Sequence, residues 1–327
     1  MKSFLNHPDT LLAESLAGFA ATHADLVTLV ADGNFIRRKH LARGKVAIIS
    51  GGGSGHEPLH CGFVGQGMLD AACPGHLFTS PTPDQLAKTA SAASGGAGII
   101  FVVKNYAGDV MNFDMAADLL PGKVHQIIVS DDLATGPKKE TRRGISGTLV
   151  VQKIVGAAAE HKMTVEQIFA LGKQVNQSTR SIGVALEGSS NLLTKQKSFP
   201  LLDNHLEFGV GIHGEPGTHR INHKSANEMA DDMCAAILSD IKEDLKKPAL
   251  LLVNGLGGSS MSELYFMYYL ARQKLETSGV TIVRSLVGNY VTSLNMAGCS
   301  ITLTSMTEEM LRLWDAPVVT PSLRWGA

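Results

Sequence analysis

Cysteine is scarce in this sequence, and long apolar runs are missing. Only four cysteines occur among the 327 residues, and no two of them form a CxxC pair. This pattern argues against a zinc knuckle or a thiol redox motif. No stretch of about 18 consecutive apolar residues is present, so no membrane-spanning helix is expected. The N-terminal residues also lack the pattern of a signal peptide, and we expect a reduced, cytoplasmic protein.

An excess of either charge is missing as well. The formal net charge is -1, with 29 basic against 30 acidic side chains. The sequence therefore has no electrostatic footprint for nucleic acid or for an anionic membrane, and neither is expected as a partner. Hydrophobic residues make up 44% of the chain, which favours a folded protein over a disordered one. The length is sufficient for two ordinary domains.

Glycine is plentiful, and its densest cluster follows an apolar run near the N-terminus. Residues 45–50 (KVAIIS) predict a buried strand, and residues 51–58 (GGGSGHEP) predict a loop after it. Such a junction is a usual place for a small-molecule site, although a simple tight turn is the alternative. The familiar glycine motifs do not fit. No lysine follows as in a P-loop, and His56 interrupts both the dinucleotide fingerprint and the nucleophile elbow.

Apolar strands alternate with helices along the first part of the chain. This alternation predicts an α/β fold with a mostly parallel sheet flanked by helices. The predicted strands are 45–50, 99–103 and 126–129, and the predicted helices are 8–30, 84–94, 110–120, 146–160 and 164–177. Residues 31–44 and 60–83 are predicted to be loops, and the second of these, rich in Gly and Pro, is long enough to be functional.

A second, smaller α/β domain with a mixed sheet is predicted after a polar stretch at residues 178–200. We place the boundary within that stretch, which gives an N-terminal domain at 1–185 and a C-terminal domain at 186–327. The predicted strands of the second domain are 207–212, 249–254, 280–286, 290–294 and 299–304, and its predicted helices are 225–244 and 260–277.

Three groups of ionisable side chains follow apolar strands: His56, the pair Lys104 and Asp109, and His213. Loops at the carboxyl ends of parallel strands gather at one edge of a sheet, so the first two groups are expected to come together. Histidine can act as a general base or as a nucleophile towards a carbonyl, and aspartate can accept a hydroxyl proton. Each residue also has a structural interpretation; Asp109, for example, could simply cap the next helix.

Metal binding is a competing hypothesis for the same region. His56, His60, His76, Asp109 and His213 are side chains that could ligate zinc. The sequence has no HxH or HExxH pattern, and a proline between His56 and His60 argues against a helix that would align them. No metal site is therefore predicted.

The string SGGGSGHEP at residues 50–58 resembles the signature of the dihydroxyacetone kinase family, in its substrate-binding part. Similar segments extend over nearly the whole chain. They are CPG at 73–75, FTSPTP at 78–83, KNY with GD at 104–109, RRG at 142–144, GVGIHGEPG at 209–217, SELY at 262–265 and WDAP at 314–317. The number and spread of these segments make the resemblance far more specific than one glycine-rich loop.

The resemblance implies roles for residues at the matching positions. His213 would attack the carbon of a ketone and hold the substrate as a covalent hemiaminal. His56 and Asp109 would form hydrogen bonds and transfer protons at the substrate hydroxyls, with His56 favoured as the general base and the reverse assignment open. The adduct would also hold the hydroxyl that attacks phosphorus in place.

Substrate binding is implied for a second set of matching positions. Lys104 and the backbone of Gly53, together with Ser54 and Gly55, would line the ketone pocket. By the same resemblance, this chain binds no cofactor itself. ADP or ATP with Mg would be carried by a separate nucleotide-binding kinase subunit, because we do not expect this protein to carry the nucleotide-binding helical domain of some family members. A phosphotransferase-system protein would recharge that subunit from phosphoenolpyruvate, and a homodimer is expected.

The resemblance leaves alternatives. Some paralogues keep the ketone pocket and act as co-activators of transcription regulators, and others phosphorylate related ketoses such as erythrulose. The motifs do not separate these functions. A metal-dependent hydrolase is a third, less favoured hypothesis.

Overall fold

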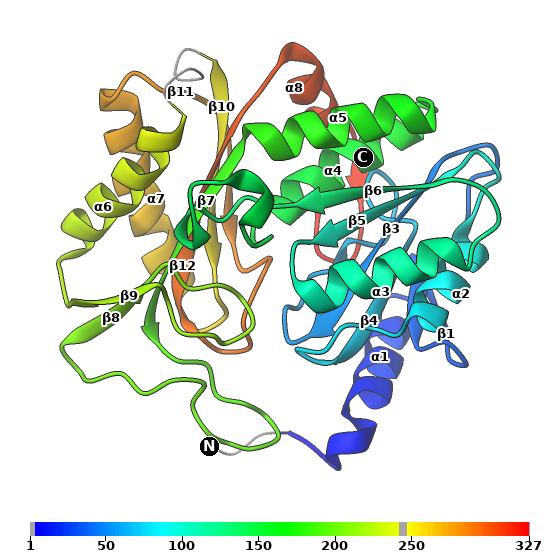
Figure 1. Ribbon diagram of the computed structural model, residues 1–327, viewed down its shortest axis with the longest axis horizontal. Coiled ribbons are helices and arrows are strands. Elements are labelled where there is room, and N and C mark those ends of the chain that lie inside the picture. The colour runs from blue at the N-terminus through cyan, green and yellow to red at the C-terminus, as the bar shows by residue number, and fades with distance from the viewer. Residues whose placement is uncertain (1–3, 242–246, 327) are drawn as a thin grey trace. The chain divides into compact units, whose positions relative to one another are not determined.

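The computed structural model describes residues 4–241 and 247–326, which form two α/β units (Figure 1). The unit that carries His56, here called the His56 unit, comprises residues 4–129, 148–174 and 310–326. The His213 unit comprises residues 130–147, 175–241 and 247–309. Each unit contains a six-stranded sheet, so the prediction of two α/β domains is confirmed.

The sheet of the His56 unit has the strand order β1-β2-β4-β3-β5-β6. Its strands are β1 (Val27–Val30), β2 (Phe35–Arg38), β3 (Ala47–Ser54), β4 (Ala71–Leu77), β5 (Ile99–Lys104) and β6 (Val124–Val129). The four strands from β4 to β6 in this order pair in parallel, and the β1–β2 and β2–β4 pairs are antiparallel. The mostly parallel sheet predicted from the apolar runs is therefore present. Parallel strands are usually covered on both faces, and every residue of β5 is buried.

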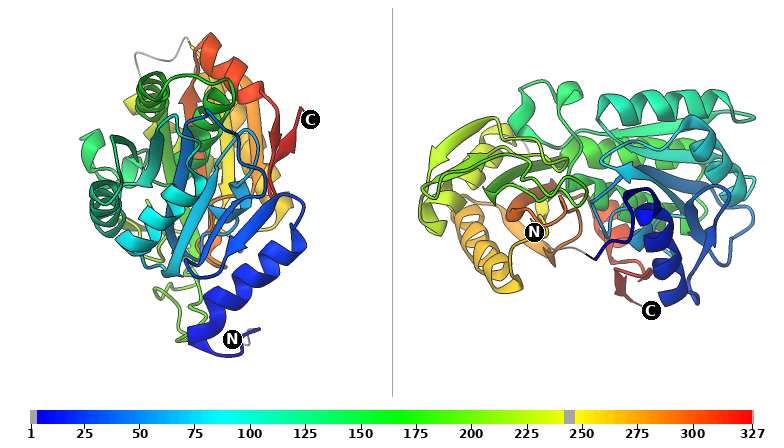
Figure 2. Two further views of the ribbon diagram at one scale, coloured as in Figure 1. Left: turned by 90° about the vertical axis from the view of Figure 1, so that its right-hand side faces the viewer. Right: turned by 90° about the horizontal axis from the view of Figure 1, so that it is seen from below.

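Helices flank this sheet. They are α1 (Leu11–Thr22), α2 (Pro83–Ala93), α3 (Ala107–Asp118), α4 (Gly147–Glu160) and α5 (Val165–Ser178), and α8 (Glu308–Asp315) is bound to α4 by the hydrogen bond from Lys153 Nζ to the Leu313 carbonyl. Helices α2 and α3 contact each other and the sheet (Figure 1), and α1 lies beside β1 and β2 (Figure 2). The Phe113 ring of α3 meets the Phe101 ring of β5 edge to face at 5.0 Å, within a buried apolar core.

The sheet of the His213 unit has the order β11-β10-β12-β7-β8-β9. Its strands are β7 (Thr179–Glu187), β8 (His205–Phe208), β9 (His219–Asn222), β10 (Pro248–Gly255), β11 (Thr281–Gly288) and β12 (Ala297–Ser305). Only the β10–β11 pair is parallel among the described strands of this sheet, which is the mixed sheet that was predicted. Helices α6 (Ala226–Asp240) and α7 (Met261–Thr277) pack side by side on it (Figure 1) and share one apolar core with β7, β10 and β12.

The predicted domain boundary at residues 185 and 186 differs from the division in the structure. It falls inside β7, which lies between β12 and β8 in the sheet. The polar composition of this stretch misled the prediction because β7 buries hydroxyl groups in pairs. Thr179 Oγ1 lies 3.0 Å from Thr304 Oγ1, and Ser181 Oγ lies 2.7 Å from Thr302 Oγ1. The chain also passes between the units more than once, which a single boundary cannot describe.

Several polar or glycine-rich segments form strands that the sequence pattern did not predict. The helix predicted at 8–30 ends at Thr22 and is followed by β1, while the predicted loops at 31–44 and 60–83 contain β2 and β4. Residues 51–53 continue β3 and are not a loop. Residues 290–294 form no strand. The helix predicted at 225–244 ends at Asp240, and its last three positions lie outside the described residues.

Packing explains why glycine continues β3. A Cβ at Gly51 would lie 2.5 Å from the Cys73 carbonyl oxygen, and one at Gly53 would lie 2.5 Å from the Thr79 nitrogen. These glycines therefore permit close backbone contacts inside the His56 unit. Across residues 4–241 and 247–326, every helix is too short or too polar to cross a membrane.

Candidate functional site

The carboxyl end of β3 lies against ionisable side chains from the next elements of the chain. Lys104 is the last residue of β5, and Asp109 lies in the first turn of α3. A Cβ at Gly52 would lie 2.2 Å from Lys104 Nζ and 3.3 Å from Asp109 Oδ2. Gly52 therefore leaves the space in which the ammonium and the carboxylate meet.

Lys104 and Asp109 form a buried ion pair. Lys104 Nζ lies 2.8 Å from Asp109 Oδ2, and the two side chains are 0% and 4% exposed. The structural alternative, in which Asp109 caps α3, is not what the structure has. Tyr106 is the N-cap residue, and the Asp109 carboxylate faces Lys104. A buried ion pair costs desolvation energy, so its presence at a strand end is typical of a functional site.

His60 joins this cluster. Its Nε2 lies 3.5 Å from Lys104 Nζ, and its Nδ1 lies 2.8 Å from Gln152 Nε2 and 3.0 Å from Ser50 Oγ. Burial lowers the pKa of His60 well below its usual value, and the positive charge of Lys104 and the His56 ring lower it further. The His60 imidazole is therefore neutral at neutral pH.

Sequence reasoning had placed His60 only among possible metal ligands, and it missed Ser50 and Gln152. One signal for Gln152 was available, because it is a polar residue within the apolar run of α4. Its contact with His60 depends on the packing of α4 against β3, which no local pattern reveals. Among the described residues, no three His, Cys, Asp or Glu side chains are arranged to hold a metal ion.

His56 is fully buried in the same unit. Its ring lies 5.3 Å from the Phe78 ring at an interplanar angle of 38°. The Ser54 hydroxyl donates to the Gly75 carbonyl at 2.6 Å, which leaves its oxygen as an acceptor. The Gly55 N–H donates to the Glu57 carboxylate at 3.0 Å. The structure thus places Gly51 and Gly52 against Lys104, and both His56 and Lys104 lie close enough to His60 to lower its pKa.

His213 belongs to the other unit, in the loop of residues 209–218 between β8 and β9. Its side chain is half-buried, and its backbone N–H donates to Glu215 Oε2 at 2.7 Å. Arg143 binds the other oxygen of the same carboxylate, with Nη1 to Oε1 at 3.0 Å. The sequence had singled out residues 142–144 only as a matching segment and gave no role to Arg143 or Glu215.

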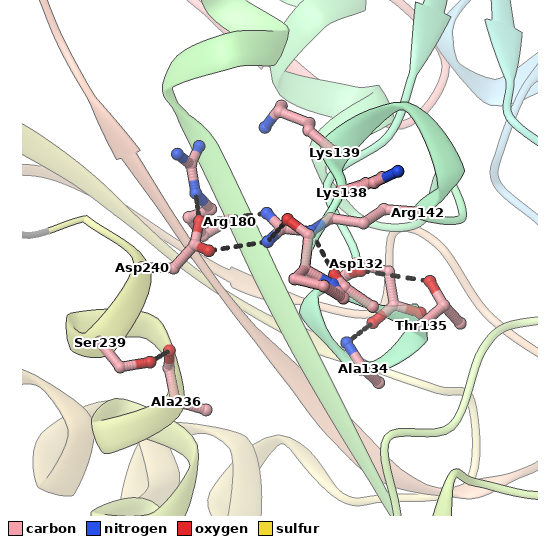
Figure 3. Close-up of polar contacts among 12 residues, drawn as sticks. Asp132, Ala134, Thr135, Lys138, Lys139, Arg142, Arg180, Ala236, Ser239 and Asp240 are labelled. Carbon is pink, nitrogen blue, oxygen red and sulfur yellow. Dashed lines mark hydrogen bonds and ion pairs between the residues drawn. The ribbon is translucent and has the colours of Figure 1, made fainter.

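A second group of ion pairs holds the segment that precedes Arg143. Arg142 binds both oxygens of Asp240 through its two terminal nitrogens, at 2.7 and 3.1 Å, and Arg180 binds the same carboxylate (Figure 3). The hydrogen bond from Arg142 has the largest effect on the pKa of Asp240, and together the two arginines lower this pKa to about 2. Both arginines also donate to nearby backbone carbonyls, so the cluster is a structural support of the His213 unit.

The geometry of the His56 unit suits a small polar substrate. It places a cation, a carboxylate and two buried histidines beside the glycines of β3. Such a set can bind hydroxyl groups and move a proton between them. The half-buried imidazole of His213 is a candidate nucleophile.

Comparisons with known proteins agree with the resemblance of the motifs. The Dak1 domain matches residues 17–322. The "PEP-dependent dihydroxyacetone kinase, dihydroxyacetone-binding subunit DhaK" of Escherichia coli (strain K12) is 42% identical, over 100% of both chains. The L-erythrulose kinase of Pectobacterium atrosepticum is 37% identical over 100% of this chain and 57% of its own.

A solved structure with the same fold is the "Dihydroxyacetone kinase operon co-activator Dha-DhaQ". It has a TM-score of 0.89 and 31% identity, and the match covers 94% of this chain and 97% of that one. From the motif matches, the two α/β units and these similarities, we conclude that the chain belongs to the Dak1 domain family of dihydroxyacetone kinases.

Proposed function

We propose that this chain is the dihydroxyacetone-binding subunit of a dihydroxyacetone kinase. The observation that carries the proposal is the similarity to the Escherichia coli subunit, which extends over 100% of both chains at 42% identity. The buried Lys104–Asp109 pair beside Gly52 supports it, because an ammonium can donate to, and a carboxylate can accept from, the oxygens of a small polyhydroxy ketone.

His213 is proposed to hold the ketone covalently. A lone pair of the imidazole attacks the carbonyl carbon, and the π electrons of the C=O bond move to its oxygen. That oxygen takes up a proton while the imidazole loses its own N–H proton, so the product is a neutral hemiaminal. Glycerol has no carbonyl and cannot form this adduct. Selection against plain polyols would then rest on chemistry and not on size.

Residues of the His56 unit are proposed to prepare the hydroxyl that is phosphorylated. His56 removes the hydroxyl proton as the oxygen attacks phosphorus, and Asp109 assists by accepting a hydrogen bond. Lys104 donates to a substrate oxygen, and the backbone of Gly53 with Ser54 and Gly55 lines the pocket. The Ser54 hydroxyl already donates to Gly75, so Ser54 would act as an acceptor.

The phosphoryl group is proposed to arrive on a separate subunit. The sequence contains no P-loop motif, and the Escherichia coli relative is named as one subunit of a PEP-dependent kinase. That partner would carry ADP or ATP with Mg, and a phosphotransferase-system protein would recharge it.

Reconstitution tests this function. The chain is mixed with a nucleotide-loaded kinase subunit, the phosphodonor system and dihydroxyacetone, and dihydroxyacetone phosphate is measured. Product is expected with dihydroxyacetone and none with glycerol. Binding of the ketone without phosphorylated product would contradict the kinase function.

Two relatives support alternatives. The co-activator structure, at 31% identity, suggests a ketone-sensing subunit without turnover. The L-erythrulose kinase, at 37% identity, suggests a related ketose as substrate. The same reconstitution with erythrulose in place of dihydroxyacetone separates the substrates, and absence of product with both ketoses would favour the sensor.

A further inference from the structure

The loop that carries His213 is closed by a side chain from a distant segment. Arg143 Nη2 donates to the Gly209 carbonyl at 2.7 Å, and Nη1 donates to Glu215 Oε1 at 3.0 Å. One guanidinium therefore binds the beginning of the loop and a side chain near its end, with His213 between them.

Glu215 connects this guanidinium to the backbone of His213. Its Oε2 accepts the His213 N–H at 2.7 Å, while Oε1 accepts from Arg143. Gly211 leaves the space that the Glu215 carboxylate occupies. A Cβ at Gly211 would lie 1.9 Å from Glu215 Oε1 and 2.9 Å from Arg143 Nη1. Any side chain at Gly211 would force the carboxylate out of this position.

Arg143 is itself held in place from behind. Its Nε and Nη2 lie 2.7 and 2.6 Å from Asp132 Oδ2, and Asp132 is fully buried. Asp132 Oδ1 in turn accepts the Ala134 N–H at 3.0 Å (Figure 3). The planar fork of the guanidinium thus meets three acceptors at once, which a lysine ammonium on a flexible stem cannot reproduce.

We propose that Arg143 is a positioning residue for His213: with Asp132 and Glu215 it fixes the backbone of the 209–215 loop so that the imidazole meets the ketone carbon in the reactive orientation. This inference rests on the proposed function, since it assumes that His213 forms the adduct. Arg143 does not touch the substrate in this account. It acts through the Glu215 carboxylate and the Gly209 carbonyl.

Loss of the Arg143 contacts is expected to lower the rate at which His213 forms the adduct. A nucleophile displaced by about 1 Å loses roughly 100-fold in rate. Arg143→Lys keeps the charge and loses the three-point fork. Glu215→Gln keeps an acceptor oxygen for His213 and loses the ion pair with Arg143. Both changes are expected to slow adduct formation by roughly 10- to 100-fold.

The chain offers a matched control in the pair Arg220 and Glu207. These residues join β9 to β8, the two strands that flank the His213 loop, with Nη2 2.6 Å from Oε1. Arg220→Lys and Glu207→Gln make the same chemical changes beside the loop, and the hydrogen bonds of the Arg220 guanidinium go to Glu207 and to the Pro200 carbonyl. They are expected to keep the wild-type rate of adduct formation.

The experiment is rapid mixing of each full-length variant with dihydroxyacetone, followed by intact mass spectrometry, with urea unfolding of the same samples. The amide resonance of His213 is followed by NMR, because a hydrogen bond to a carboxylate shifts it. Slow adduct formation with a displaced His213 amide in Arg143→Lys and Glu215→Gln, but not in the control pair, supports the proposal.

Wild-type rates in both variants would overturn the inference, and so would equal slowing in the control pair, because stability alone would then explain the effect. If Arg143→Lys does not fold, the nearly isosteric Glu215→Gln decides. If the wild-type chain itself forms no adduct, the proposed chemistry of His213 fails first, and the two failures are thereby distinguished.

Discussion

Lys104 Nζ and Asp109 Oδ2 lie 2.8 Å apart, and neither side chain is more than 4% exposed. Removing one partner of a buried pair leaves the other charge uncompensated, which costs about 3–5 kcal/mol. Asp109→Asn is therefore expected to lower the free energy of urea unfolding by roughly this amount, and the double change Lys104→Met with Asp109→Asn by less. A double variant less stable than Asp109→Asn would contradict this coupling.

Asp109→Asn also separates binding from turnover. The amide can still accept a hydrogen bond from a substrate hydroxyl, but it cannot assist proton removal. The variant is expected to form the His213 adduct and to lose most turnover in the reconstituted assay. Unchanged turnover would argue against a proton-transfer role for Asp109.

Gly52→Ala tests the space beside Lys104. The backbone of Gly52 has φ +149, and an added Cβ would lie 2.2 Å from Lys104 Nζ. The methyl group must displace the ammonium, so ketone affinity is expected to fall at least roughly 10-fold. Gly18→Ala in α1, where a Cβ would meet nothing within 4 Å, is the control and should leave ketone affinity unchanged. Equal affinity of Gly52→Ala and wild type would remove Lys104 from the binding site.

His60 should remain neutral in the folded protein at mildly acidic pH. Its pKa is lowered by burial and then by Lys104, so below a pH of about 6.5 the unfolded chain binds a proton that the folded chain does not. The free energy of unfolding is therefore expected to decrease as the pH falls below this value, because protonation of His60 then favours the unfolded chain. An NMR titration is expected to give no charge change of His60 near 6.5. A titration midpoint of His60 near pH 6.5 would contradict this prediction, because it would show that the buried surroundings of His60 do not prevent its protonation.

Asp240 is expected to make the stability of the folded protein depend on pH in the acidic range. Arg142 and Arg180 lower its pKa to about 2 from 3.8, so its stabilising ionised form is present above pH 3.8 and is lost as the pH falls towards 2. Asp240→Asn is expected to cost about 2 kcal/mol at pH 7, and clearly less at pH 2. The exposed Asp203, changed to Asn, serves as the control in urea unfolding at both pH values. A cost for Asp240→Asn that does not depend on pH would contradict the ion-pair account.

Local patterns predicted much of the fold and part of the candidate site. The apolar runs at β5, β6 and β10 and the amphipathic helices were identified because their signals are short in range. Strands β4 and β7 were missed because one contains Pro and Gly and the other buries paired hydroxyl groups against β12. The glycines of β3 were assigned to a loop. Glycine is favoured both in turns and in strands that pack closely against other backbone, so its presence does not distinguish the two.

His56, Lys104 and Asp109 were singled out because each lies at or after the end of an apolar strand, and their roles stay predictions. His60 and Gln152 meet only through tertiary packing, and the Arg143–Glu215 contact joins residues far apart in the sequence. The periodicity of apolar residues in the sequence does not predict such tertiary contacts. The assignment of His213 came from a resemblance between motifs and remains a proposal about chemistry.

The central claim is that His213 binds a ketone covalently, and intact mass spectrometry under native conditions tests it most directly. The wild-type chain mixed with dihydroxyacetone is expected to gain the mass of one ketone, and fragmentation of the intact ion is expected to keep that mass on the segment that contains His213, as a covalent bond does and a non-covalent complex does not. The wild-type chain mixed with glycerol and the His213→Ala variant mixed with dihydroxyacetone are expected to gain none. An adduct that persists in His213→Ala, or a wild-type chain that never gains the mass, would contradict the account.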